Sequence, residues 1–144
     1  MIPKYRAWIS EGDTMTYDIK GIDFENETVV LRRTSWDEEH SVEEEIFEVE
    51  IGNAILMQSL GLFDKFGVEI FESDILTDGR ELACIKKHPT LGFYADRHGY
   101  VEYIARSLSL KDFEGAVKTV ARNLEVIGNI YETPQLLKVD NELD

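Results

Sequence analysis

The sequence predicts a mainly β protein, a β-rich α+β fold of short antiparallel strands, from three observations. Short runs rich in Val, Ile, Phe and Tyr recur along most of the chain and are separated by turn residues, which is the spacing of a small barrel or sandwich. Of the 144 residues, 43% are hydrophobic, so the chain can bury a core. One segment, residues 109–121, has apolar residues at helical spacing and predicts a helix near the C-terminus.

Residues 1–60 are expected to form an N-terminal β-rich part. The alternation of apolar and polar residues predicts strands over 5–9, 15–19, 22–24, 28–31 and 46–51. Residues 53–60 fit either a buried strand or a helical turn, because periodicity does not decide between them at this length. Residues 34–40 have no periodicity and are expected to form an exposed loop.

Residues 61–138 are expected to form a C-terminal barrel-like part, followed by a disordered tail at 139–144. Asp64 to Gly67 suits a tight turn in which the glycine takes a positive φ, and Asp78-Gly79 is a strong hairpin signal. Ser109 can cap the helix 109–121 in the manner of a capping box. A final strand is expected over 124–131, with a last helical turn at 134–138.

The chain is acidic, with 29 Asp+Glu against 15 Lys+Arg and a formal net charge of -14. No Lys or Arg falls between positions 37 and 50, a stretch that includes Glu43, Glu44, Glu45, Glu48 and Glu50. Because nucleic-acid affinity comes mainly from cations, direct binding of DNA or RNA is not expected. The usual role of such a stretch is solubility, and the alternative is a face that docks a basic partner, as a mimic of DNA would.

Membrane and secretion signals are not apparent in the sequence. No run reaches about 18 consecutive apolar residues, and the first residues lack the apolar stretch of a secretion signal. The single cysteine, Cys84, excludes an internal disulfide framework and a multi-cysteine zinc site. It sits between apolar residues, which favours a buried, inert thiol over a nucleophile. These observations predict a soluble cytoplasmic protein.

Two groups of residues have the types that carry chemistry. His88, Asp96 and His98 could ligate a metal, but such spacing is common by chance near turns, so no metal or cofactor is expected. Glu72 and Asp74 could act as paired carboxylates. An aspartate that enters a strand more often accepts hydrogen bonds from backbone N–H groups, so we expect Asp74 to cap a turn.

Trp36 stands in a polar segment beside Asp37-Glu38-Glu39. An aromatic residue in such a place is either tucked against the body or presented as an anchor for a partner. Because aromatic residues are more often buried than displayed, we expect Trp36 to be tucked.

Blocks along nearly the whole chain resemble the YopX family of phage and prophage proteins. These blocks are Arg6-Ala7-Trp8 with Met15 and Tyr17, the stretches 56–67 and 69–75, and the stretch 125–132 followed by Pro134, Leu136 and Leu137. The resemblance implies a mostly β fold, an origin in a bacteriophage or integrated prophage, and no established activity, with no catalytic residue to carry over. The middle and end blocks also look like a small five-stranded barrel of the SH3-like kind, which implies a fold and no ligand.

This chain departs from the family pattern at two turn positions. Ser73 stands where the family usually has Gly, and Phe66 stands where it often has Asn. Phe63 and Phe66 also place two aromatic residues in a loop that tends to be polar in the family. That composition favours a surface for self-association or for a partner.

Three functions remain open at this point. We expect an uncharacterised phage or prophage protein that acts by protein–protein contact in the cytoplasm of a bacterial host, with a homo-oligomer as one form of that contact. The first alternative is an acidic DNA mimic that inhibits a host DNA-binding or defence protein, which predicts carboxylates along one elongated face. The second is a small enzyme with carboxylate and histidine groups, Glu72, Asp74, Asp96 and His98, within about 10 Å of one another. The absence of a specific catalytic motif favours contact over catalysis, and no catalytic, cofactor-binding or metal-binding residue is assigned.

Overall fold

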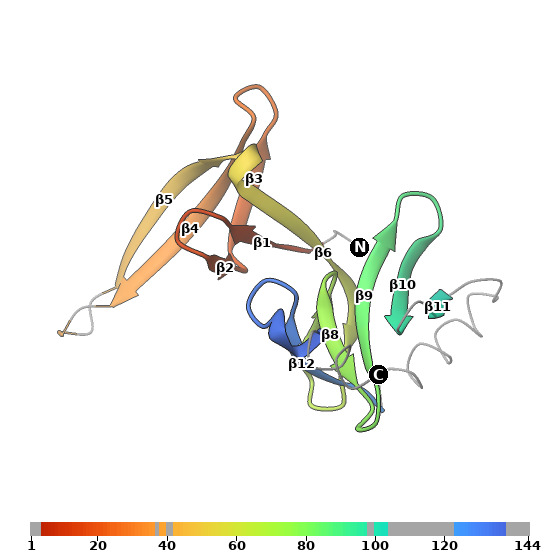
Figure 1. The fold of residues 1–144 in the computed structure, drawn as a ribbon. Helices are drawn as coiled ribbons and strands as arrows, with labels where there is room; N and C mark the ends of the chain where they lie inside the picture. The colour runs from red at the N-terminus through yellow and green to blue at the C-terminus, as the bar shows by residue number, and fades with distance from the viewer. Residues whose placement is uncertain (1–3, 37, 40–41, 98–99, 104–122, 138–144) are drawn as a thin grey trace. The chain divides into compact units, whose positions relative to one another are not determined.

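Figure 1 shows the fold of the chain in a computed structural model, whose described residues are 4–36, 38–39, 42–97, 100–103 and 123–137. The chain divides into two compact units. The N-terminal unit is Tyr5–Met57, and the C-terminal unit is Met1–Lys4 together with Gln58–Asp144.

Strands make up nearly all of the regular structure of the described residues. Those of the N-terminal unit are β1 (Tyr5–Ile9), β2 (Thr14–Thr16), β3 (Ile19–Asp23), β4 (Thr28–Trp36) and β5 (Val42–Glu50). A short 3-10 helix, η1 (Ile51–Asn53), leads into β6 (Ala54–Phe63), which continues into the C-terminal unit. The remaining strands are β7 (Glu69–Phe71), β8 (Asp74–Thr77), β9 (Leu82–His88), β10 (Gly92–Arg97), β11 (Tyr100–Tyr103) and β12 (Glu125–Asn129).

In the N-terminal unit, β3, β4 and β5 form an antiparallel sheet with β4 in the centre. β1 pairs with β2 on one side and lies beside β6 on the other. Side chains on a strand alternate between the two faces. This alternation gathers one core of apolar residues, Ala7, Ile9, Val29, Leu31 and Ala54. Phe47 and Val49 of β5 pack against that core.

The C-terminal unit contains the largest sheet, in the order β11-β10-β9-β8-β12, with each neighbouring pair antiparallel. One sheet of the protein curls into a half-barrel, and β6 pairs with β7. The core consists of Ile70, Leu76, Ile85 and Leu124. Lys4 also belongs to this unit, and the backbone N–H of Ser59 donates to its carbonyl at 2.8 Å.

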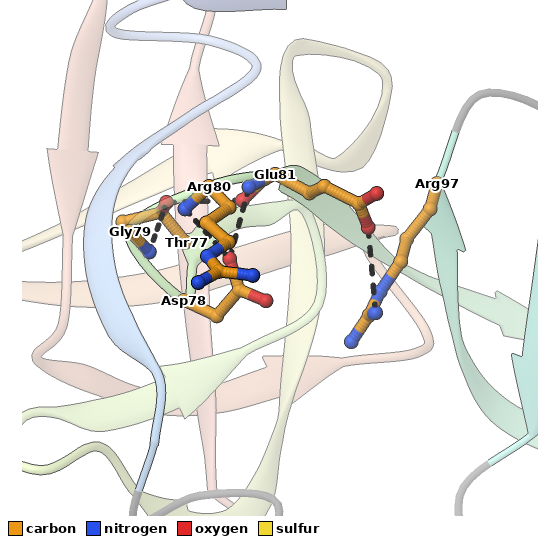
Figure 2. A network of polar contacts seen from close by, with 6 residues as sticks. All are labelled: Thr77, Asp78, Gly79, Arg80, Glu81 and Arg97. Carbon is orange, nitrogen blue, oxygen red and sulfur yellow. Dashed lines mark hydrogen bonds and ion pairs between the residues drawn. The ribbon is translucent and has the colours of Figure 1, made fainter.

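The β8–β9 turn shows how local sequence fixes a bend (Figure 2). Asp78 Oδ1 accepts hydrogen bonds from the backbone N–H groups of Arg80 and Glu81 at 2.8 and 2.9 Å. Thr77 Oγ1 accepts from the N–H of Gly79 and donates to the carbonyl of Glu81, both at 3.0 Å. Gly79 has a φ of 97°, a conformation that glycine adopts without steric cost. The hairpin predicted from Asp78-Gly79 is therefore confirmed.

The predicted fold class is confirmed, since the protein is mainly β with antiparallel sheets. The expected strand over 15–19 is wrong as a single element, because residues 17–18 belong to no strand and separate β2 from β3. Most of the ambiguous segment 53–60 is the strand β6, and a helical turn is present at 135–137. The boundary expected after residue 60 and the one found after Met57 both fall within β6. The predicted helix 109–121 and tail 139–144 lie outside the described residues.

Candidate functional site

The outer half of the β4–β5 hairpin extends beyond β3. β3 pairs with β4 only between residues 28 and 31, whereas β5 pairs with β4 from Thr28↔Glu50 to Trp36↔Val42. Residues 32–36 and 42–46 therefore form a two-stranded extension that we call the outer ribbon. Figure 1 shows β4 and β5 as one long hairpin.

Three large apolar side chains lie on one face of the outer ribbon. Trp36 and Val42 are directly opposite each other in the ladder, and Ile46 shares their face because every second residue of a strand does. Their exposed fractions are 70% for Trp36, 48% for Val42 and 62% for Ile46. One exposed apolar residue is ordinary, but a group on one face is typical of an interaction site. We call these three residues the apolar face.

The pleat of the two strands explains why these side chains point away from the core. Phe47 and Val49 are in phase with each other and pack on the core of the N-terminal unit. Ile46 is one position out of phase with them, so it lies on the opposite face. In β4, Leu31 is buried on the core face, and Trp36, five positions further, lies on the opposite one.

The glutamates of β5 are exposed and divide between the two faces. Those on the apolar face are Glu44, Glu48 and Glu50, and those on the opposite face are Glu43 and Glu45. β5 itself contains no Lys or Arg. The apolar face is therefore bordered by negative charge along the outer strand.

Two expectations about this region are wrong. Residues 34–36 are not part of a loop but belong to β4, and Trp36 is exposed rather than tucked. The reason is the register, because pairing with β5 carries the backbone of β4 past the last residue that β3 covers. The available signal was the spacing of Val42 and Ile46, which share a strand face.

The candidate metal ligands in the C-terminal unit make other contacts. His88 Nδ1 accepts hydrogen bonds from the backbone N–H groups of Thr90 and Leu91, both at 3.1 Å, and so closes the β9–β10 turn. Asp96 Oδ2 lies 2.8 Å from Lys86 Nζ. Lys86 Nζ donates a hydrogen bond to this carboxylate, and that bond raises the pKa of Lys86.

The ladder also separates these candidates in space. Asp96 is paired with Cys84, which is four positions along β9 from His88, a separation of about 13 Å at the rise of a strand. His98 lies outside the described residues. Among the residues that the structure describes, no three His, Cys, Asp or Glu side chains are grouped so that they could hold a metal ion.

No helix in the described ranges is long and apolar enough to cross a membrane.

In the candidate pair Glu72 and Asp74, Asp74 has a structural role. Asp74 is buried, and its Oδ2 accepts a hydrogen bond from the backbone N–H of Phe71 at 2.8 Å. This is the capping role that the sequence predicts. The turn places Ser73 at a φ of 76°, in the left-handed region that favours glycine, and the Ser73 N–H donates to the carbonyl of Ile85 at 2.7 Å.

Cys84 is buried, and burial raises the pKa of its thiol. The expectation of a buried cysteine is confirmed. A thiol with a raised pKa forms little thiolate near neutral pH, so it is a poor nucleophile and a poor metal ligand.

Asp64 is a buried carboxylate that joins two distant parts of the C-terminal unit. Its Oδ1 accepts hydrogen bonds from the backbone N–H groups of Phe66 and Val68, each at 2.8 Å, and its Oδ2 accepts from Val126 at 2.9 Å. Burial opposes ionisation of Asp64, but these hydrogen bonds outweigh it and hold its pKa below the ordinary value. The predicted tight turn is confirmed, with Gly67 at a φ of 84°.

A network of hydrogen bonds surrounds Asn129 at the end of β12, and the sequence analysis did not single out this residue. Asn129 Oδ1 accepts from the backbone N–H groups of Tyr131 and Glu132 at 3.0 and 2.8 Å. The Asn129 N–H donates to Thr133 Oγ1, and that hydroxyl donates to the Asn129 carbonyl, both at 3.0 Å. A Cβ on Gly128 would overlap the same hydroxyl. The available signal was an asparagine followed four positions later by a threonine at a strand end.

The C-terminal unit carries an exposed apolar group of its own. Phe63, Phe66 and Val68 flank the turn after β6, and Phe66 is 68% exposed. Lys65 Nζ lies 5.1 Å from the centre of the Phe66 ring. Whether this group binds a partner or a second copy stays a prediction.

Comparison with known proteins places the chain in a family. The family described as YopX protein matches residues 4–138. Among solved structures, the crystal structure of protein EF1440 from Enterococcus faecalis is similar, with a TM-score of 0.59 and 27% sequence identity over 95% of this chain and 99% of that chain. Comparison with curated proteins gives no match. Because the family match covers nearly the whole chain, this protein is a member of the YopX family.

Proposed function

We propose that this protein acts by binding another protein, and that the apolar face of the outer ribbon is the contact surface. The observation that carries the proposal is Trp36, which is 70% exposed and directly opposite the exposed Val42, with Ile46 on the same face. Trp is among the residues that contribute most to binding when a partner covers them.

The exposed area is large enough to contribute substantially to affinity. Trp36 is 70% exposed, so covering it removes about 170 Å² from water and stabilises a complex by about 4 kcal/mol. Val42 and Ile46 add about 1 kcal/mol each for their exposed parts. Association itself costs several kcal/mol, so the apolar face needs further contacts, polar or electrostatic, to give a stable complex.

A DNA mimic receives less support from this surface. That function requires carboxylates along one elongated face, whereas the pleat of β5 puts Glu43 and Glu45 on one face and Glu44, Glu48 and Glu50 on the other. A charged mimic also has no use for an exposed Trp and Ile between its carboxylates. Catalysis by the expected group, Glu72, Asp74, Asp96 and His98, receives less support as well, because Asp74 is buried and caps a turn and Asp96 is paired with Lys86.

The family supports a setting for this contact. We propose that this contact takes place in the cytoplasm of a bacterial host, in keeping with the phage or prophage origin that the resemblance implies. The partner is then a host protein or another protein encoded by the same phage.

The test is affinity capture from a bacterial host lysate, followed by binding of the recovered protein in purified form. The baits are the natural chain, a Trp36→Ser and Ile46→Ser double variant, and Phe24→Ser as a matched control. Phe24 is an exposed aromatic residue of the same unit, but it lies in the turn between β3 and β4, outside the outer ribbon. We expect the double variant to weaken binding of the purified partner by about 30-fold or more, which corresponds to about 2 kcal/mol, while the control binds normally. Equal binding by all three baits would contradict the proposal.

A further inference from the structure

The outer edge of β5 carries backbone groups that point away from β4. The N–H of Ile51 donates to the carbonyl of Glu27 at 2.9 Å, and the N–H of Arg32 donates to the carbonyl of Asp18 at 3.1 Å. Bonded pairs alternate along an antiparallel ladder, so the first contact puts the β4–β5 bonds at odd-numbered residues. The second contact agrees, because the N–H of Arg32, an even-numbered residue of β4, points toward Asp18 and therefore away from β5. The even-numbered residues of β5, from 42 to 50, therefore direct N–H and C=O groups outward.

This edge is long, and it is the last strand of its sheet. The order is β3-β4-β5, and within the described part of the chain no strand pairs with the outer side of β5. A nine-residue edge of this kind is a template for pairing with an added strand.

We propose that the outer edge of β5 binds a Lys- or Arg-rich extended segment of the partner protein as an added antiparallel strand. The inference deepens the proposed function and rests on it, because the same hairpin carries the apolar face. Charge complementarity identifies the occupant: β5 contains five glutamates and no cation. Opposite charges directly across a ladder contribute about 0.2–1 kcal/mol for each pair.

The register gives the partner segment a pattern. Val42 and Ile46 require apolar residues opposite them, and Glu44, Glu48 and Glu50 require basic residues. Read in the antiparallel direction, the partner strand is basic-x-basic-x-apolar-x-basic-x-apolar. Its two apolar side chains lie on the same face as Trp36 and extend the apolar face.

A second copy of this chain fits the edge poorly. Antiparallel pairing of two β5 strands centred on Ile46 puts Glu44 of each copy opposite Glu48 of the other. Like charges directly opposite each other destabilise a ladder. The net charge of -14 adds repulsion between whole chains.

The first experiment uses the full chain and a labelled peptide, Lys-Thr-Lys-Thr-Val-Thr-Lys-Thr-Val, with binding followed by fluorescence anisotropy at low salt. One version carries N-methyl groups on its two Val residues, whose N–H groups face β5 in the proposed register. The matched control carries two N-methyl groups on Thr residues, whose N–H groups face solvent. We expect methylation at Val to weaken binding at least about tenfold more than methylation at Thr. A Glu-for-Lys version of the peptide is expected to show no binding.

The second experiment changes the edge itself. Glu44→Pro removes the side-chain charge and one outward N–H but no bond of the β4–β5 ladder, and Glu44→Thr removes the charge alone. We expect the Pro variant to bind the peptide about tenfold more weakly than the Thr variant. Circular dichroism checks that both variants are folded, and if the Pro variant is not, the methylated peptides decide. The variant with Glu43, Glu44 and Glu45 changed to Lys is expected to show no binding of the peptide.

The outcomes separate this inference from the proposed function. Equal binding of the two methylated peptides, or of the Pro and Thr variants, overturns strand addition. A dimer in sedimentation equilibrium that Glu44→Pro abolishes assigns the edge to a second copy and overturns it as well. If strand addition fails while the Trp36→Ser and Ile46→Ser double variant still binds the captured partner more weakly, the proposed function stands. If that double variant binds the partner as tightly as the natural chain does, the proposed function fails, whatever the peptide shows.

Discussion

Replacing Gly128 with Ala adds one methyl group at a place that the Thr133 side chain already occupies. A Cβ on Gly128 would overlap Thr133 Oγ1 and would lie 3.1 Å from Thr133 Cβ and 3.2 Å from Leu136 Cδ1. Gly128 is not among the glycines with a positive φ, so its backbone suits alanine. The perturbation is therefore steric and is confined to the hydrogen-bond network around Asn129 at the end of β12.

The structure sets the size of the effect. The Thr133 hydroxyl is held by two hydrogen bonds to Asn129, each at 3.0 Å, so it moves aside only by losing them. Overpacking costs about 1–3 kcal/mol, and each lost hydrogen bond costs about 1 kcal/mol. Alanine regains about 0.5–1 kcal/mol because it is less flexible than glycine in the unfolded chain. We expect Gly128→Ala to lower the free energy of unfolding by about 2–4 kcal/mol.

Urea denaturation of four chains measures this: the natural chain, Gly128→Ala, Thr133→Ala and the double variant. Thr133→Ala removes the hydroxyl that the new methyl group meets. In that background Gly128→Ala is expected to cost about 1–2 kcal/mol less than in the natural chain. Additive effects, or a single Gly128→Ala variant as stable as the natural chain, would refute the steric argument.

Three further predictions concern the C-terminal unit. Ser73→Gly should raise the melting temperature by about 2–4 °C, because Ser73 has a φ of 76° and glycine relieves about 1 kcal/mol of strain; a lower melting temperature would contradict this. Asp64→Asn should destabilise the fold by about 2–3 kcal/mol, since an amide NH₂ would face the N–H of Val126. Because the pKa of Asp64 is lower in the folded chain than in the unfolded one, its stabilisation is complete above the unfolded pKa and is lost as pH falls through the folded pKa. Stability measured against pH should therefore fall less on acidification for Asp64→Asn than for the natural chain, and parallel curves would refute the role of the charge. Cys84 should react with iodoacetamide at pH 8 at least roughly tenfold more slowly in the native chain than in urea, because burial raises the pKa of its thiol; equal rates would show that the thiol is accessible.

The sequence predicted those parts of the fold that short-range chemistry decides. Asp78-Gly79 and Asp64 to Gly67 bend the chain through an aspartate that accepts backbone N–H bonds and a glycine with a positive φ. The departure at Ser73 also marked a real feature, because that residue has the φ that a glycine would adopt.

The sequence did not predict features that depend on distant partners. Val126, whose N–H reaches Asp64, is 62 positions away from it, and no local pattern connects the two. The exposure of Trp36 depends on how far β5 extends the ladder relative to β3, which is set by pairing and not by side-chain alternation. The expectation that an aromatic residue is buried failed there for that reason.

The way in which Lys4 and Ser59 are bonded has a consequence for how this chain can be rearranged. The segment Tyr5–Met57 leaves the C-terminal unit and returns to it at one place, where that hydrogen bond of 2.8 Å spans the exit and the re-entry. It is thus a nested insert, of the kind that can be exchanged because its two ends are close together. A graft that keeps the chain up to Lys4 and from Gln58 onward could accept a different insert, so one carrier could display hairpins of different specificity.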